Sequence, residues 1–190
     1  MFENYKIILG SKSPRRRELL KALDIDFEVK DIDIQENYPA DLPVKKIPEY
    51  IAKQKADACK IFLEANTILI TADTIVAHNG KVFGKPKDEN EAKMMLKTLA
   101  NAAHEVITGV CITTLKGQKS FSDTTKVTFS DMDDAEIDYY IKKYKPFDKA
   151  GGYGIQEWIG FACAEKIDGS FYNVMGLPIQ KIYEELKIEN

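Results

Sequence analysis

Apolar residues along the chain follow two spacings, one typical of strands and one typical of helices. The strand-like segments are short, rich in Ile, Val, Leu, Phe and Thr, and bounded by turn-forming residues. They cover residues 5–9, 27–32, 67–72, 75–78, 81–83, 106–115, 119–129, 158–167 and 170–174. Asn79-Gly80 joins two of them, and this pair is the strongest short signal for a hairpin turn. We therefore expect a large sheet.

Segments with a helical spacing of apolar residues lie between these strands. We expect helices to begin near residue 13 and near residue 178, and to cover residues 47–65, 88–99 and 133–144. Ser13 and Asp88 suit the position before a helix, and Pro14 suits its first turn. Strands alternate with helices, and no long linker interrupts the chain. The pattern predicts an α/β protein with a large mixed sheet, folded as a single domain over residues 1–190.

Length and composition narrow the class of protein. With 190 residues, 44% of them hydrophobic, the chain can bury a core. A formal net charge of −3 argues against a general affinity for nucleic acid or anionic membranes. No segment approaches the ~20 apolar residues of a spanning helix, and Met1 leads into polar residues, so we expect the cytoplasm. The cysteines form no CxxC pair and are expected to be reduced core residues: Cys59, Cys111 and Cys163.

The segment between the first strand and the first helix carries hydroxyls and cations. Ser11 and Ser13 precede three consecutive arginines at residues 15–17. Free N–H groups at a helix start attract anions, and arginine forks match phosphate oxygens in pairs. Cations in the first helical turn oppose the helix dipole, and this local cost calls for an explanation. Taken alone, the segment fits either a polyphosphate site or an ordinary helix start with a solvated basic turn.

Four further charged residues stand beside apolar segments or turns. Asp73 interrupts the apolar run at residues 68–76, where a charge is costly to bury without a partner. Lys85 lies on a stiff Gly-Lys-Pro turn, Lys55 on the second helix and Glu36 in an acidic loop. A strand-end Asp is often a turn former, and most lysines are simply solvated. These readings stay open for the residues taken singly.

Together these segments resemble, in order and spacing, the Maf family of nucleoside triphosphate pyrophosphatases, once described as septum-formation inhibitors. The segments that carry the resemblance are residues 11–16, Glu36, and residues 55–56, 72–74, 84–86, 104–110, 148–156 and 176–178. The resemblance implies an elongated α/β fold of the Maf and ITPase type. A long central mixed sheet would be flanked by helices, with a substrate cleft between two lobes. There a nucleoside triphosphate would be cut between its α- and β-phosphates, to monophosphate and pyrophosphate.

The resemblance and the chemistry of phosphates assign roles to the same residues. A triphosphate carries about four negative charges, so its cleavage needs cationic groups, a metal held by carboxylates and a positioned water. The residues expected to bind phosphate are Ser11, Ser13, Arg15, Arg16, Lys55 and Lys85. Asp73 is expected to act as general base or to activate a metal-bound water, with Glu36 as its partner for the metal. Oxygen ligands and the lack of a His/Cys cluster favour Mg²⁺ or Mn²⁺.

Three residues bear on substrate specificity. Arg15, Thr74 and Gln156 match the family branch that acts on dTTP and UTP rather than the branch that acts on 7-methyl-GTP. The amide of Gln156 offers a donor and an acceptor, as the O4 and N3–H edge of uracil or thymine requires. Taken alone, Gln156 fits a polar residue that closes a turn. The chain departs from the family pattern at Gly10, Lys12 and Gly152. Lys12 is an extra cation within the phosphate-binding segment, so the family pattern does not define which groups there contact phosphate.

Two other functions are alternatives to an enzyme. A nucleotide-sensing regulator of cell division is supported only by the naming of the family, and Asp73 with Glu36 favours turnover. Nucleic-acid binding through residues 15–17 is disfavoured by the net charge. We expect a nucleoside triphosphate as substrate and neither nucleic acid nor membrane as partner, with a homodimer left open. The remaining aromatic residues are expected to be core or dimer contacts rather than base-stacking platforms: Tyr139, Tyr140, Tyr144, Trp158 and Phe161.

Overall fold

The structure is a computed structural model that describes residue 2 and residues 4–189. Its contacts divide the chain into two compact units. The first unit comprises Met1–Asp73, Thr108–Asp123 and Gly176–Asn190, and the second comprises Thr74–Ile107 and Thr124–Met175. Three strands run from one unit into the other, because three of the boundaries fall inside strands. The expectation of a single domain stays a prediction.

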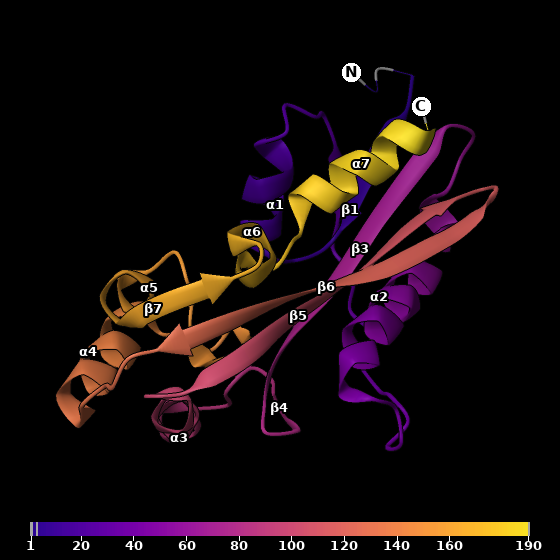
Figure 1. The fold of residues 1–190 in the computed structure, drawn as a ribbon. Coiled ribbons are helices and arrows are strands. Elements are labelled where there is room, and N and C mark those ends of the chain that lie inside the picture. The colour runs from indigo at the N-terminus through magenta and orange to yellow at the C-terminus, as the bar shows by residue number, and fades with distance from the viewer. Residues whose placement is uncertain (1, 3, 190) are drawn as a thin grey trace. The chain divides into compact units, whose positions relative to one another are not determined.

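Seven strands pair in one mixed sheet. They are β1 (Lys6–Gly10), β2 (Glu28–Lys30), β3 (Thr67–His78), β4 (Lys81–Phe83), β5 (Ala103–Thr114), β6 (Gly117–Phe129) and β7 (Ala164–Asp168). Their order is β2-β1-β3-β5-β6-β7, with β4 paired to β3 (Figure 1). β1 runs parallel to β2 and β3, whereas the β3–β4 and β6–β7 pairs are antiparallel. The predicted mixed sheet of an α/β fold is therefore confirmed.

Helices connect most of these strands. They are α1 (Pro14–Lys21), α2 (Ile47–Ala58), α3 (Glu89–Leu99), α4 (Asp134–Tyr144), α5 (Trp158–Cys163), α6 (Phe171–Met175) and α7 (Ile179–Glu189). Short 3₁₀ turns cover Val44–Lys46, Lys60–Phe62 and Ala150–Gly152. Ser13 caps α1 and Asp88 caps α3, each through a side-chain oxygen that accepts a backbone N–H of the first turn. Both predicted helix starts are confirmed.

The core of the first unit lies under α2. Ala52 and Ala56 on this helix pack against Ile8 of β1, Leu69 of β3 and Cys111 of β5, all of them fully buried. The small side chains of the two alanines let the helix backbone approach the strands closely. A hydrogen bond also joins α2 to β6: Ser120 Oγ donates to the carboxylate of Glu49 at 2.7 Å.

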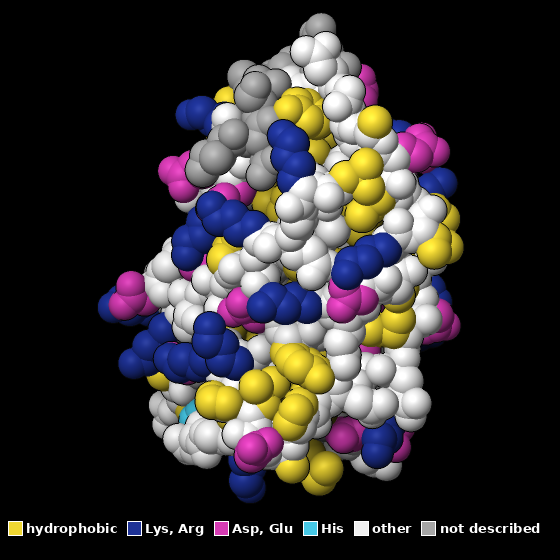
Figure 2. All heavy atoms as spheres, turned by 90° about the vertical axis from the view of Figure 1, so that its right-hand side faces the viewer, with side chains coloured by type: hydrophobic (Ala, Val, Ile, Leu, Met, Phe, Trp, Pro, Cys, Tyr) yellow, Lys and Arg dark blue, Asp and Glu magenta, His cyan; other side chains and the backbone are white. Residues whose placement is uncertain are grey.

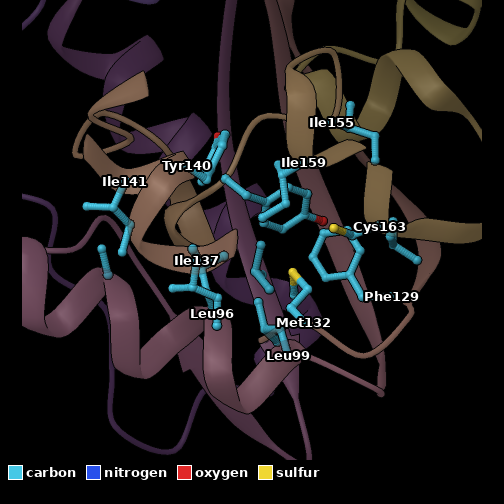
Figure 3. Close-up of a cluster of buried hydrophobic side chains, with 14 of the residues drawn as sticks. Leu96, Leu99, Phe129, Met132, Ile137, Tyr140, Ile141, Ile155, Ile159 and Cys163 are labelled. Atoms are coloured by element: carbon cyan, nitrogen blue, oxygen red, sulfur yellow. The ribbon is translucent and has the colours of Figure 1, made fainter. Parts of the chain in front are cut away.

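The core of the second unit is larger and contains several aromatic rings (Figure 3). Side chains from α3, α4 and α5 converge there on strand β6. The labelled members are Leu96, Leu99, Phe129, Met132, Ile137, Tyr140, Ile141, Ile155, Ile159 and Cys163. Because Ile155 belongs to this core, the segment just before Gln156 is anchored to it.

Two elements in the first half of the chain differ in length from the prediction. Residues 67–72 and 75–78 form one continuous strand, β3, so Asp73 lies inside a strand. The helix predicted over 47–65 ends at Ala58, and a 3₁₀ turn follows. Ile61 is 82% exposed, but Cys59 is buried, and Phe62 and Leu63 still pack in part against the core of the first unit. The apolar residues that suggested a longer helix therefore contact the core from a 3₁₀ turn and the loop after it.

Two segments in the last third, predicted as strands, are wrong. Residues 158–163 form α5 and residues 171–175 form α6; of residues 158–167 only 164–167 are extended, within β7. In α5, Ile159 and Cys163 are buried on one helical face. The hydroxyl of Ser170 accepts the N–H of Asn173 at 3.2 Å, which is a helix cap rather than a strand start. Aromatic residues favour strands by propensity, but tertiary packing stabilises helices in these two segments.

The other expectations have mixed outcomes. All three cysteines are free and buried, as expected. Tyr140 is fully buried, whereas Phe161 is 81% exposed, so a core position for Phe161 is wrong and a dimer contact stays a prediction.

On the face shown in Figure 2, Lys and Arg side chains are interspersed with Asp and Glu. Among the described residues, no helix combines the length and apolar character needed to cross a membrane.

Candidate active site

The loop between β1 and α1 places both predicted serines in local hydrogen bonds. Ser13 Oγ accepts the N–H of Arg16 at 3.4 Å as the cap of α1. Ser11 is buried, and its hydroxyl accepts the N–H of Ser13 at 3.2 Å and a guanidinium N–H of Arg16 at 3.5 Å. The two hydroxyls therefore shape the turn that leads into the helix. This turn also brings Arg16 back toward the end of β1.

Arg16 is fixed by backbone carbonyls from two distant segments of the same unit. Its Nε donates to the carbonyl of Gly176 and its Nη1 to the carbonyl of Ala72, both at 2.8 Å. Burial lowers the pKa of Arg16, and the nearby carboxylate of Asp73 acts in the opposite direction. The guanidinium still stays charged, because an arginine pKa starts above 12. A permanent cation is thus held beside the strand position that carries Asp73.

Asp73, Lys55 and Glu36 form a compact charged cluster in the first unit. Lys55 Nζ lies 2.6 Å from Asp73 Oδ1 and 2.7 Å from Glu36 Oε1. The Lys55 and Asp73 side chains are only 14% and 12% exposed, while that of Glu36 is 43% exposed. A charge buried in β3 requires such a partner. Lys55 is therefore no ordinary surface lysine, and Asp73 is not a turn former.

Two other cations near this loop, Lys12 and Arg17, are paired with surface carboxylates. Lys12 Nζ lies 3.0 Å from Asp33, and Arg17 Nη2 lies 2.8 Å from Asp31. These pairs are largely exposed, so each contributes little to stability. Of the three consecutive arginines, the structure thus directs Arg16 inward to the backbone beside Asp73 and Arg17 outward to an acidic strand end.

Of the remaining predicted residues, Arg15 lies on α1 in the first unit, whereas Thr74, Lys85 and Gln156 belong to the second unit. The turn that carries Lys85 is joined to the Gly-rich segment, because Gly151 N–H donates to the carbonyl of Gly84 at 3.0 Å. Gly151 adopts a φ of 69°, and a Cβ there would lie 2.8 Å from Val76. A glycine is therefore required at this close approach. The Lys85 turn and the segment leading to Gln156 are thus brought together.

The side chain of Gln156 has an unused acceptor. It is half-buried, and its Oε1 is buried without a hydrogen-bond partner among the described residues. A buried amide oxygen is usually satisfied, so an orphan one marks a position that a ligand can complete. Gly154 N–H, Tyr140 and Glu157 surround the same turn with a hydrogen-bonded network.

The sequence did not predict the network of Tyr140, Lys149 and Glu157 around this turn. Lys149 is almost fully buried, and its ammonium lies 2.8 Å from Asp148 and 3.1 Å from Glu157. A lysine followed by Ala-Gly-Gly in an otherwise apolar segment was the signal that could have indicated it.

The donor set for a metal ion is small and made of oxygens. Among the residues the structure describes, no group of three or more His, Cys, Asp and Glu side chains is arranged to hold a metal. Asp73 and Glu36 nevertheless both direct an oxygen at one cationic atom, Lys55 Nζ. Two carboxylates fit Mg²⁺ or Mn²⁺, which take their other ligands from substrate phosphates and water.

Comparisons with known proteins agree along nearly the whole chain. A family model described as Maf-like protein matches residues 6–189. A protein of Parabacteroides distasonis named dTTP/UTP pyrophosphatase is 56% identical over 191 residues, covering 98% of this chain and 99% of the relative. One of Porphyromonas gingivalis with the same name is 53% identical over 188 residues, covering 97% and 94%.

A solved structure shares the fold at low sequence identity. The Ham1 protein of Staphylococcus aureus matches with a TM-score of 0.50 and 18% identity, over 66% of this chain and 72% of that one. At this identity the likeness speaks for the fold alone. The family match and the close relatives lead to one conclusion. The chain belongs to the family of Maf-like proteins.

Proposed function

We propose that the protein is a nucleoside triphosphate pyrophosphatase that hydrolyses dTTP and UTP between the α- and β-phosphates. The observation that carries the proposal is the cluster in which Lys55 bridges Asp73 and Glu36 with Arg16 fixed alongside. Membership of the family supports it, as do relatives more than 50% identical that are named dTTP/UTP pyrophosphatase. The products are a nucleoside monophosphate and pyrophosphate.

The chemistry needs a base and several cations. A water adds to phosphorus while the bridging anhydride bond breaks, and the proton of that water moves to Asp73. Arg16 and Lys55, with Arg15 and Lys85, balance the charge on the phosphate oxygens as pyrophosphate leaves. Arg16 is well suited because its contacts to the Gly176 and Ala72 carbonyls fix the guanidinium plane before substrate arrives.

Asp73 and Glu36 would hold the divalent metal. A bound Mg²⁺ or Mn²⁺ would acidify the attacking water and neutralise phosphate charge. Lys55 keeps the two carboxylates close to each other, at 2.6 and 2.7 Å from one ammonium. The residues of the chain thus supply paired oxygens at one point. A non-catalytic nucleotide sensor would need the cations but not this pair of carboxylates.

Gln156, with Thr74 and Arg15, is proposed to select the pyrimidine base. The orphan Oε1 of Gln156 would accept the N3–H of uracil or thymine, and its NH₂ would donate to a base carbonyl. Gln156→Ala should lower kcat/KM for dTTP and UTP by about 5- to 100-fold, because a buried polar edge of the base is left unpaired. GTP should change little. An equal fall for all nucleotides would mean that Gln156 only shapes the turn.

A nucleotide panel tests the proposed function. Purified protein with Mg²⁺ or Mn²⁺ is offered dTTP, UTP, CTP, GTP and 7-methyl-GTP, and monophosphate and pyrophosphate are quantified. We expect dTTP and UTP to be the best substrates. Preference for 7-methyl-GTP would overturn the specificity, and nucleotide binding without turnover would support a sensor instead. Free buried cysteines and nucleotide substrates fit a reducing, nucleotide-rich compartment, and we propose the cytoplasm.

A further inference from the structure

The turn that carries Gln156 is closed and anchored at both ends. Glu157 N–H donates to the carbonyl of Gly154 at 3.0 Å, so Ile155 and Gln156 occupy the two central positions of a tight turn. The N–H of Gly154 in turn donates to the hydroxyl of Tyr140 at 2.9 Å. Ile155 is buried in the core of the second unit. The orientation of Gln156 therefore depends on what fixes Gly154 and Glu157.

The carboxylate of Glu157 is held by two buried groups. Its Oε2 accepts the hydroxyl proton of Tyr140, and its Oε1 lies 3.1 Å from the ammonium of Lys149. Lys149 also pairs with Asp148 at 2.8 Å. Tyr140 comes from α4, so one helix residue contacts the start and the end of the turn. Burial raises the pKa of Tyr140, and the bond to Glu157 raises it further, which keeps the hydroxyl protonated as a donor.

Gly154 leaves room for two side chains that belong to the same turn. A Cβ at this position would lie 2.8 Å from Cδ of Glu157 and 3.1 Å from Nε2 of Gln156. Those distances are too short for any larger residue without moving both side chains. The Glu157 carboxylate and the Gln156 amide thus pack side by side over the glycine. Whatever holds the carboxylate also limits where the amide can lie.

We propose that Tyr140, Lys149 and Glu157 are positioning residues that hold the Gln156 amide in the orientation needed to read a pyrimidine base. The inference rests on the proposed function of Gln156. None of the three side chains is assigned to the substrate itself. Each acts through the turn: Tyr140 at both ends, Lys149 by neutralising the Glu157 carboxylate, and Glu157 by packing against the amide.

Tyr140→Phe removes one hydroxyl and keeps the ring in the core. We expect kcat/KM for dTTP and UTP to fall about 5- to 20-fold, with GTP changed less than about twofold, because the lost orientation matters only for the base that Gln156 reads. In a Gln156→Ala background, the same substitution should leave the ratio of dTTP to GTP unchanged, since the residue it acts through is gone.

Tyr144→Phe is the matched control. Tyr144 lies on the same helix and stacks on Tyr140 with ring centroids 5.1 Å apart, and in the described part of the chain its hydroxyl makes no hydrogen bond. It should behave like wild type. If Tyr140→Phe does not fold, Glu157→Gln serves in its place, because it keeps the size of the side chain while removing the charge that pairs with Lys149.

A second readout is independent of catalysis. Amide hydrogen exchange at Gly154 should quicken in Tyr140→Phe and not in Tyr144→Phe, since only the former loses the acceptor of that N–H. Unchanged discrimination in Tyr140→Phe, or an equal loss for dTTP and GTP in both backgrounds, would overturn the positioning role. Inactivity of the wild type toward every nucleotide would instead overturn the proposed function, while the exchange result would still decide whether Tyr140 holds the turn.

Discussion

Asp73 shows how one residue acquires a role from its surroundings. It lies inside β3 rather than in a turn, is nearly buried, and contacts the ammonium of Lys55 at 2.6 Å. An unpaired carboxylate in such a place would be destabilising, so the lysine makes the position tolerable. The guanidinium of Arg16 adds a second cation nearby. Asp73 therefore lies next to two cations that could also bind a polyphosphate.

Asp73→Asn keeps the size of the side chain and removes its charge. We expect turnover of dTTP to fall on the order of 10²–10⁴-fold while nucleotide binding is largely kept, because the proton acceptor and metal ligand are lost. Steady-state kinetics and calorimetric binding measure the two effects. Asp41→Asn, at an exposed position of the same unit, is the control. Near-normal turnover in Asp73→Asn would remove Asp73 from the mechanism.

Arg16 and Arg17 offer a matched pair of neighbours. Arg16→Ala should weaken binding of a non-hydrolysable dTTP analogue roughly 10- to 100-fold, because a half-buried guanidinium proposed to contact phosphate is lost. Arg17→Ala should change it less than about threefold, since Arg17 pairs with exposed Asp31. Equal effects of the two substitutions in a binding titration would argue against a specific role for Arg16.

At the level of elements, the sequence predicts well where local signals and burial agree. Ser13 and Asp88 mark true helix starts, and the apolar runs of β1 and β3 are true strands. The wrong assignments of element type lie in residues 158–175, where short aromatic segments are helical. There the helices are fixed by contacts distant in sequence, such as the bonds from the Asn173 amide to Val106 and Thr125. No local pattern encodes those partners.

Helix α5 also depends on a close backbone contact. A Cβ at Gly160 would lie 1.8 Å from the carbonyl oxygen of Ile155. Helix propensity alone favours Ala over Gly by about 1 kcal/mol, but the clash with rigid backbone outweighs this gain. Gly160→Ala should therefore lower the free energy of unfolding by more than about 2 kcal/mol, measured in urea. Gly84→Ala, where a Cβ meets no atom within 4 Å, is the control; stabilisation by Gly160→Ala would contradict this packing.

For the whole molecule, the candidate site could be predicted only in part. The apolar run around Asp73 drew attention to that carboxylate, and the motif spacing shared with the family indicated Lys55, Arg16 and Gln156. The bridge from Lys55 to Glu36 joins residues from separate segments, and sequence spacing carries no such distance. The sequence around Lys149 likewise carries a local signal but does not identify the members of its network, which come from α4 and from the loop.

The pH dependence of unfolding is also a property of the whole molecule. His104 is buried against Tyr153 and Phe129, and burial lowers its pKa to about 4, with a smaller effect from His78. In the unfolded chain a histidine takes up its proton near pH 6.5. Between pH 6.5 and 4 only the unfolded state is protonated, so the stability falls as the pH falls, by up to roughly 3 kcal/mol.

Urea unfolding of wild type and His104→Gln at several pH values checks this. Above pH 7 the difference between the two proteins should be constant, and from pH 6.5 downward the wild type should lose stability more steeply. His78→Gln is the control for the other histidine. Parallel curves for wild type and His104→Gln would show that His104 is protonated in the folded protein as readily as in the unfolded one.

The position of bond cleavage tests the central claim most directly. Hydrolysis of dTTP with Mg²⁺ is followed by ³¹P NMR, which separates the signals of pyrophosphate, orthophosphate, dTDP and dTMP. We predict that pyrophosphate and dTMP appear together in equal amounts, without dTDP, and that Asp73→Asn slows both. Release of orthophosphate with accumulation of dTDP would contradict cleavage between the α- and β-phosphates.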